Sequence, residues 1–156
     1  MNPTSTNKGG WLNSQMKTFI NNDIYNSLPQ ELKSVIITTE TVSGRGRLDT
    51  VEYFTSPDKL YLLSTAEVWS QGINSDTARD KTRQLDYYKI KGVTTNREDW
   101  NGAIKKDSTG SESWWWLRSA TSSNINFGFC NVSYNGNWGD NGADFRLGVS
   151  PAFRIG

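Results

Sequence analysis

The stretch Trp114-Trp115-Trp116-Leu117-Arg118-Ser119 decides the fold, because a continuous apolar run of this kind is typical of a strand in a protein core. In a strand, Trp114 and Trp116 share a face with Arg118, and Trp115 and Leu117 share the other. Two interpretations follow. The run is an aromatic platform for a sugar ring or another stacked ligand, or it is a central strand buried on both faces, with Arg118 reaching a carboxylate. The unbroken run favours the buried strand.

The chain before this stretch predicts helices. Apolar residues recur at spacings of three and four over residues 11–28, which predicts one amphipathic helix: Met16, Phe19, Ile20, Ile24 and Leu28. Asn13 or Ser14 can cap its start, and Pro29 ends it. A short helix is expected over 30–34.

Two strands and a third helix are expected next. The β-branched run 35–39 predicts a strand, and 43–47 a turn. A compact apolar run predicts a second strand over 59–64. Ser64 and Glu67 then have the spacing of a capping box, which predicts a helix over 64–69.

The chain after Ser119 looks β. We expect a strand over 124–134, a hairpin turn over 134–138 and a last strand over 148–155, with Pro151 favouring a sheet edge. We also expect the first and last strands to pair and so to bring the termini together. Helices early and strands late make this an α+β chain.

Length and charge limit the function. The chain has 156 residues and a net charge of +1, with no basic cluster, so we expect no nucleic-acid partner. No apolar run is long enough for a membrane span, and the first residues lack the apolar core of a signal peptide. We interpret residues 1–8 as a linker and 9–156 as one domain.

Residue types also limit the chemistry. The chain has no His and a single Cys, Cys130, which removes His-based catalytic pairs and zinc sites and predicts a small buried side chain at Cys130. Asp140 and Asp144, with Asn137 and Asn141, carry oxygen atoms suited to calcium, but their spacing does not match an EF-hand loop. We therefore expect no enzyme, no cofactor and no metal.

The last forty residues, 117–156, contain no Lys, Glu, Gln or Met, although the preceding 116 residues contain nine Lys, six Glu, four Gln and two Met. Asn, Gly, Ser, Asp and aromatic residues take their place. This composition fits a long surface loop, and it equally fits an adaptable binding surface.

Several motifs, in order, carry a resemblance. GGWLNSQMKTFIN, IYNSLP, DKLYLLSTAEVW, WWLRS, FCNV, NGNW and GVSPAFRI resemble an uncharacterised domain family of bacterial and phage proteins with a C-type lectin-like fold. The resemblance covers residues 9–155 and is weakest over 71–112. It implies helices packed on a small antiparallel sheet with long irregular loops, and a β core formed by 114–119, 149–155 and part of 128–132.

The resemblance extends to the variable proteins of diversity-generating retroelements. In those systems a template is copied with errors at adenines, and a randomised AAC codon cannot encode Lys, Glu, Gln, Met or Trp. The resemblance therefore implies a diversified segment over about 119–148, with Trp138 as a fixed position. It also implies six template-like or resampled positions: Asn124, Asn126, Asn131, Asn135, Asn137 and Asn141. The implied ligand-binding residues are Thr121, Ser123, Asn124, Asn126, Ser133, Tyr134, Asn137, Trp138, Asp140, Asn141, Asp144, Phe145, Arg146 and Leu147.

The implied function is recognition of a protein or glycan ligand on a cell surface. The domain would be displayed on a phage tail or on a bacterial surface. The sequence does not determine its oligomeric state and is compatible with a monomer. Two alternatives stay open: a carbohydrate-binding module of fixed specificity that stacks sugars on Trp138 or Tyr134, and a structural tail or adhesin domain. An enzyme of the formylglycine-generating or sulfoxide-synthase branch of the fold is disfavoured, because those enzymes use Cys pairs or His metal sites.

Overall fold

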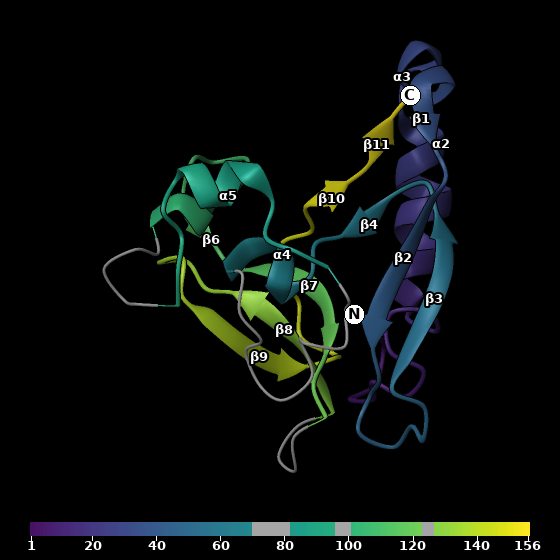
Figure 1. Cartoon of the computed structure of the whole chain (residues 1–156), viewed down its shortest axis with the longest axis vertical. Helices are drawn as coiled ribbons and strands as arrows, with labels where there is room; N and C mark the ends of the chain where they lie inside the picture. The colour runs from purple at the N-terminus through teal and green to yellow at the C-terminus, as the bar shows by residue number, and fades with distance from the viewer. Residues whose placement is uncertain (70–81, 96–100, 123–126) are drawn as a thin grey trace.

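The chain folds as a mixed α and β domain with few helices and several small antiparallel sheets (Figure 1). The structure, a computed structural model, describes residues 1–69, 82–95, 101–122 and 127–156. The N-terminal helices and the β2–β3 hairpin form one side of the molecule, and the β7–β8–β9 sheet with α4 and α5 forms the other (Figure 1). The α+β expectation is confirmed at this level.

The predicted first helix is present but shorter and irregular. It runs as α1 (Gln15–Phe19), a π-helical turn η1 (Ile20–Ile24) and α2 (Tyr25–Ser27). Ser14 caps it, because its side chain accepts a hydrogen bond from the Lys17 N–H at 3.1 Å. The segment before Ser14 makes turns, so the helix does not begin at Trp11. After Pro29 the chain forms α3 (Gln30–Val35).

The first and last strands pair as expected. β1 (Ile36–Ile37) lies antiparallel to β11 (Arg154–Ile155). The termini nevertheless stay apart (Figure 1). The expectation that they meet was wrong, because three helical segments separate the N-terminal end from β1.

A hairpin follows. The sequence predicted a turn over 43–47 but not the two paired strands. β2 (Thr39–Gly44) and β3 (Tyr53–Asp58) pair over six residues. Buried Asp58 ties this hairpin to the first helix: its carboxylate accepts from Trp11 Nε1 at 3.0 Å and pairs with Lys17 Nζ at 3.2 Å.

The capping box predicted at Ser64 is present. β4 (Tyr61–Leu62) pairs with β10 (Pro151–Ala152) and leads into α4 (Thr65–Trp69). Glu67 Oε2 accepts from the Ser64 N–H at 2.7 Å, and Ser64 Oγ accepts from the Glu67 N–H at 3.3 Å. Pro151 lies in a two-stranded pair, so its predicted edge position is also confirmed.

The WWWLRS stretch forms the inner strand of the molecule. β7 (Trp115–Ala120) is buried along its whole length, and Arg118 Nη1 lies 2.5 Å from Glu67 Oε2. The buried-strand interpretation, including a carboxylate for Arg118, is therefore correct from Trp115 onward. Trp114 precedes the strand and keeps 38% of its surface exposed.

Two further strands complete this sheet in the order β7–β8–β9. β8 (Gly128–Val132) is buried at every residue, and β9 (Trp138–Gly142) is partly exposed. Nearby, β5 (Lys105–Lys106) and β6 (Glu112–Ser113) form a short hairpin, and α5 (Asp86–Ile90) covers α4. No described helix has the length and apolar character needed to cross a membrane.

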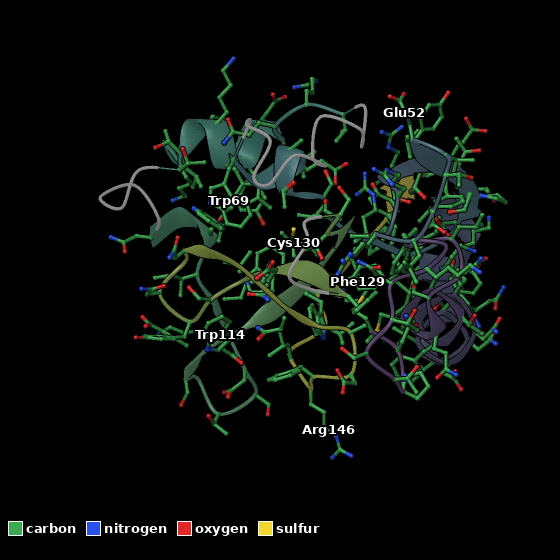
Figure 2. The ribbon with its side chains drawn as sticks, turned by 90° about the horizontal axis from the view of Figure 1, so that it is seen from below. Glu52, Trp69, Trp114, Phe129, Cys130 and Arg146 are labelled. Atoms are coloured by element: carbon green, nitrogen blue, oxygen red, sulfur yellow. The ribbon has the colours of Figure 1, made fainter. Side chains whose placement is uncertain are left out.

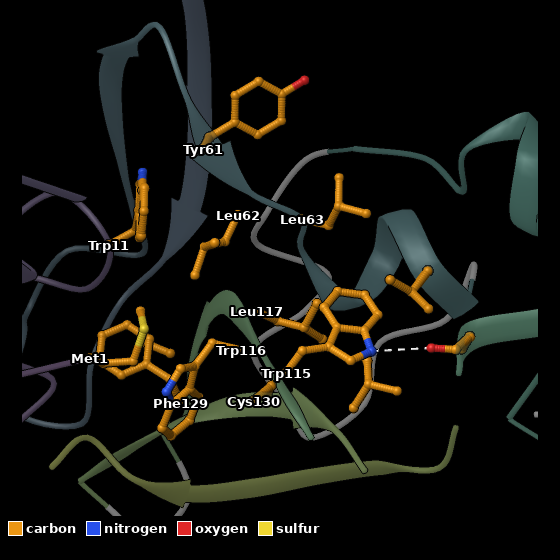
Figure 3. Packing of buried hydrophobic residues seen from close by; sticks show 14 of the residues in the cluster. Met1, Trp11, Tyr61, Leu62, Leu63, Trp115, Trp116, Leu117, Phe129 and Cys130 are labelled. Atoms are coloured by element: carbon orange, nitrogen blue, oxygen red, sulfur yellow. Dashed lines mark hydrogen bonds between the residues drawn. The ribbon is translucent and has the colours of Figure 1, made fainter. Parts of the chain in front are cut away.

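One aromatic-rich core joins the two sides (Figure 3). Trp116 and Phe129 pack beside Met1, and Cys130 is a small buried side chain, as its sequence context predicted. The predicted β core is correct for β7 and β8. Within 149–155 it holds for Val149 and Ala152, which pack against the core, and it is wrong at Phe153 and Ile155, which are 40% and 66% exposed.

Residues 1–8 are folded into the domain and do not extend as a linker. Asn7 is fully buried, and its Nδ2 donates to the Thr121 carbonyl at 2.6 Å and to the Gly128 carbonyl at 2.8 Å. Its Oδ1 accepts from the Arg47 N–H at 3.1 Å. One buried amide therefore joins the N-terminal segment to two distant loops.

Candidate ligand-binding face

The hairpin between β8 and β9 displays the first part of the candidate face. The Ser133 N–H donates to the Asn137 carbonyl at 2.8 Å, and the Gly136 N–H donates to the Ser133 carbonyl at 2.9 Å. Gly136 has φ +83°, a left-handed conformation that favours glycine. The predicted turn over 134–138 is thus confirmed, and it leaves Tyr134 and Trp138 51% and 39% exposed.

The second part of the face is a crossing segment, residues 143–147. The chain leaves β9 at Gly142 and next pairs at Gly148, which exchanges backbone hydrogen bonds with Trp114 and Trp116 at 2.8 and 3.0 Å. Because β8 lies between β9 and β7, the crossing segment passes over one face of the sheet. Ala143 is buried in the core and Leu147 is partly buried, so the residues displayed between the two ends are 144–146.

The displayed side chains of the crossing segment are chemically mixed. Asp144, Phe145 and Arg146 are exposed, and Phe145 keeps 57% of its surface in solvent. Arg146 projects away from the molecule, whereas Phe129 and Cys130 lie near its middle (Figure 2). An acid, a base and an aromatic ring side by side form a surface that can both hydrogen-bond and bury apolar groups.

A hollow of about 620 Å³ lies between the crossing segment and the N-terminal helix. Its lining residues come from both: Met1, Asn2, Pro3, Gln15, Met16, Phe19, Trp116, Asp144, Phe145, Arg146 and Leu147. Asn2 joins the two walls, because its N–H donates to the Ala143 carbonyl at 2.8 Å and its Oδ1 accepts from the Gln15 N–H at 2.9 Å. The hollow therefore has one wall in the Lys-, Glu-, Gln- and Met-free segment and one outside it.

The wall formed by the N-terminal helix was not predicted from the sequence. Met16 and Phe19 were assigned to the buried stripe of a helix, yet Phe19 is 46% exposed and both line the hollow. Both methionines of the chain, Met1 and Met16, line it. Methionine is flexible and polarisable, and it is frequent at surfaces that accept varied partners. No local pattern in the sequence indicates this wall, because the hollow forms only where the helix faces the crossing segment.

Some expected site residues do not belong to the surface. Thr121 is fully buried, and its Oγ1 donates to the Gly128 carbonyl at 3.1 Å. Ser133 is 5% exposed, with its hydroxyl donating to Asn135 Oδ1 and to the Asn137 carbonyl. Both side chains hold the β8 strand and its turn in shape, so their assignment to the ligand contact is corrected.

Asn131 is a second correction, because a template-like position must tolerate change and Asn131 is fully buried. It lies on β8 opposite Gly139. A Cβ atom at Gly139 would lie 3.0 Å from Asn131 Oδ1, so the two residues are closely packed. By contrast Asn135, Asn137, Asp140 and Asn141 are partly exposed. Variation without unfolding is therefore compatible with the hairpin and with the outer strand β9, and not with β8.

Three expected site residues, Ser123, Asn124 and Asn126, lie outside the described residues. Within the described part of the chain, no group of three or more His, Cys, Asp or Glu side chains is placed to hold a metal ion. Asp140 and Asp144 lie on β9 and on the crossing segment, respectively.

The geometry defines a small mixed α and β domain with a mostly buried framework and an exposed C-terminal face. The chain belongs to the family described as Domain of unknown function (DUF6273), whose model matches residues 1–156. No curated protein and no solved structure matches the chain.

Proposed function

We propose that this chain is a ligand-binding domain with a C-type lectin-like fold, and that its binding face combines the hollow with the β8–β9 hairpin. The observation that carries this proposal is the shared hollow. The crossing segment supplies the exposed residues Asp144, Phe145 and Arg146, while Met16 and Phe19 come from the N-terminal helix. The domain is a binder and not an enzyme, and it acts at a phage tail or a bacterial surface.

We further propose that the exposed residues of this face are diversified by a retroelement. The absence of Lys, Glu, Gln and Met after Arg118 supports this, because randomised AAC codons exclude those four residues. Tyr134, Asp144 and Phe145 are exposed, so their replacement removes little core packing. The proposed variable positions are therefore narrower than the whole 119–148 segment.

Replacement of the whole displayed set tests the proposal. The quadruple variant with Tyr134, Asp140, Asp144 and Phe145 changed to Ser should melt within a few degrees of the wild type, because surface substitutions usually change the free energy of unfolding by about 0.5 kcal/mol or less each. Leu117→Ala is the matched control, and it should cost about 2–5 kcal/mol because Leu117 is fully buried. Thermal melts followed by circular dichroism measure both.

The quadruple variant has a second readout, binding. We expect it to lose adhesion of the labelled domain to the cells that the wild type binds. A melting temperature lowered as much as in Leu117→Ala would show that the four side chains are structural, and unchanged adhesion would place the binding face elsewhere.

A carbohydrate-binding module of fixed specificity is the second candidate. It is favoured by one observation: the exposed rings of Trp114 and Tyr134 lie with centroids 6.1 Å apart at an angle of 53°. Exposed aromatic rings with apolar faces suit sugar stacking. A glycan array separates the candidates, because signal on a restricted set of sugars, lost in Tyr134→Ala, favours this module over a diversified binder.

A further inference from the structure

The β5–β6 hairpin carries two lysines in different electrostatic settings. Lys106 lies opposite Glu112, and Lys105 lies opposite Ser113. Opposite residues of an antiparallel pair share a face, so Lys106 has an acidic cross-strand neighbour and Lys105 has a neutral one. Lys105 turns to the protein side, where its Nζ lies 4.8 Å from the ring centroid of Trp115.

The Lys105 ammonium lacks a charge partner in the described part of the chain, where no carboxylate lies within 4.0 Å of its Nζ. Burial lowers the pKa of Lys105. Asp107, the next acid along the chain, is engaged in its own turn, where Oδ1 accepts from the N–H groups of Thr109 and Ser111 at 2.8 and 3.1 Å. A half-buried ammonium over an indole ring retains free hydrogen-bonding capacity for an anion.

The Trp115 ring under this ammonium is firmly held. Its Nε1 donates to the Ala103 carbonyl at 3.1 Å, the bond dashed in Figure 3, and only 2% of the residue is exposed. The hairpin, the start of β7 and residues 148–150 enclose a second hollow of about 380 Å³ here. Its polar and aromatic lining includes Lys105, Lys106, Asp107, Ser113, Trp114 and Ser150, and the Asp107 carboxylate is held in the hairpin turn.

Trp114 joins this second hollow to the aromatic pair, because the residue lines the hollow and its ring approaches Tyr134. Trp114, two serines and Lys105, which has no charge partner among the described residues, thus border one space. Such a set matches a ligand with an apolar ring face, a negative charge and several hydroxyl groups.

We propose that the second hollow binds an acidic saccharide, with its carboxylate at Lys105 and its ring on Trp114. Lys106 adds positive charge at the rim, and Ser113 and Ser150 offer hydroxyl groups to the sugar. This inference rests on the second candidate function and names its ligand class. It does not require the crossing segment to bind anything.

Nuclear magnetic resonance titration of the full chain with glucuronate and with glucose tests the proposal. Glucuronate should shift the indole N–H signals of Trp114 and Trp115 and leave that of Trp11, which is bonded to buried Asp58, in place. Glucose should bind at least about tenfold more weakly, because it lacks the charge-assisted hydrogen bond.

Three variants separate charge from folding. Lys105→Met should weaken glucuronate binding about tenfold or more and melt at or above the wild-type temperature, since it removes an ammonium whose burial disfavours the charged form. Lys105→Arg should retain binding, and Lys89→Met, which removes an exposed lysine on α5, should change nothing.

The outcomes are distinct. Equal affinity for glucose and glucuronate, or undiminished glucuronate binding in Lys105→Met, overturns the acidic ligand and leaves the carbohydrate function standing. The absence of indole shifts with either sugar overturns both.

Discussion

At the scale of single residues, the Glu67 side chain links α4 to the central part of the framework. It closes the capping box of α4 and pairs with Arg118 of β7 through the same oxygen, Oε2. Arg118 in turn donates to the Leu62 carbonyl at 2.8 Å and to the Val42 carbonyl at 3.2 Å. A single buried ion pair therefore joins a helix to three strands.

Glu67→Gln should lower the free energy of unfolding by about 3–5 kcal/mol, because it leaves the buried Arg118 guanidinium without its counter-charge. Gln still fits the capping box, so the loss reports the ion pair. Urea unfolding curves measure it. Asp86→Asn is the matched control: it breaks the exposed pair with Arg83 and should leave the curve unchanged. Equal midpoints for Glu67→Gln and wild type would contradict the framework role of Glu67.

Sequence patterns predicted these two residues only separately. Ser64 and Glu67 show a capping box because its spacing is local, and Arg118 within an apolar strand predicts a buried carboxylate partner. Which carboxylate it meets depends on how β7 packs against α4, across 51 residues. Residue spacing carries no information on that long-range contact, so the partner of Arg118 is known only from the folded structure.

At the scale of elements, β8 separates the constant from the displayed part of the C-terminal segment. It is buried throughout, pairs with both neighbours, and has its first residue, Gly128, in close contact with β9. A Cβ at Gly128 would lie 2.1 Å from the Asn141 carbonyl oxygen. Glycine is required there by the backbone of the next strand.

Gly128→Ala should therefore unfold the sheet or shift β9, because a clash with backbone cannot be relieved by a side-chain rotation. Gly110→Ala is the control: nothing lies within 4 Å of its Cβ position, so only its φ of +84° opposes the change, at about 1–2 kcal/mol. Amide hydrogen exchange of β8 and β9 compares the two. Full protection of both strands in Gly128→Ala would disprove the tight β8–β9 approach.

Elements with local signals were predictable, and those with long-range partners were not. The helix caps, the 134–138 turn and the edge position of Pro151 follow from residue types. β9 was missed because Trp138–Gly142 has two glycines and no apolar alternation, and becomes a strand only through β8. The hollow was missed for the same reason, since its walls lie more than a hundred residues apart in the chain.

At the scale of the whole molecule, the buried framework residues and the exposed residues of the proposed binding face are two separate sets. Residues with fixed roles, such as Asn7, Glu67, Arg118 and Gly128, are buried and hydrogen-bonded or closely packed. Residues proposed to vary are exposed or partly exposed, and they lie on the hairpin, on β9 and on the crossing segment. A framework of this kind permits change on its face without loss of folding.

Sequencing the gene and its flanking DNA in sibling isolates tests the central claim most directly. We predict changes concentrated at Tyr134, Asp140, Asp144 and Phe145, never to Lys, Glu, Gln or Met, with Gly128 constant and a near-copy of the segment beside a reverse transcriptase gene. Variation spread evenly over the chain, or Lys or Glu at those four positions, would contradict a diversified binding face.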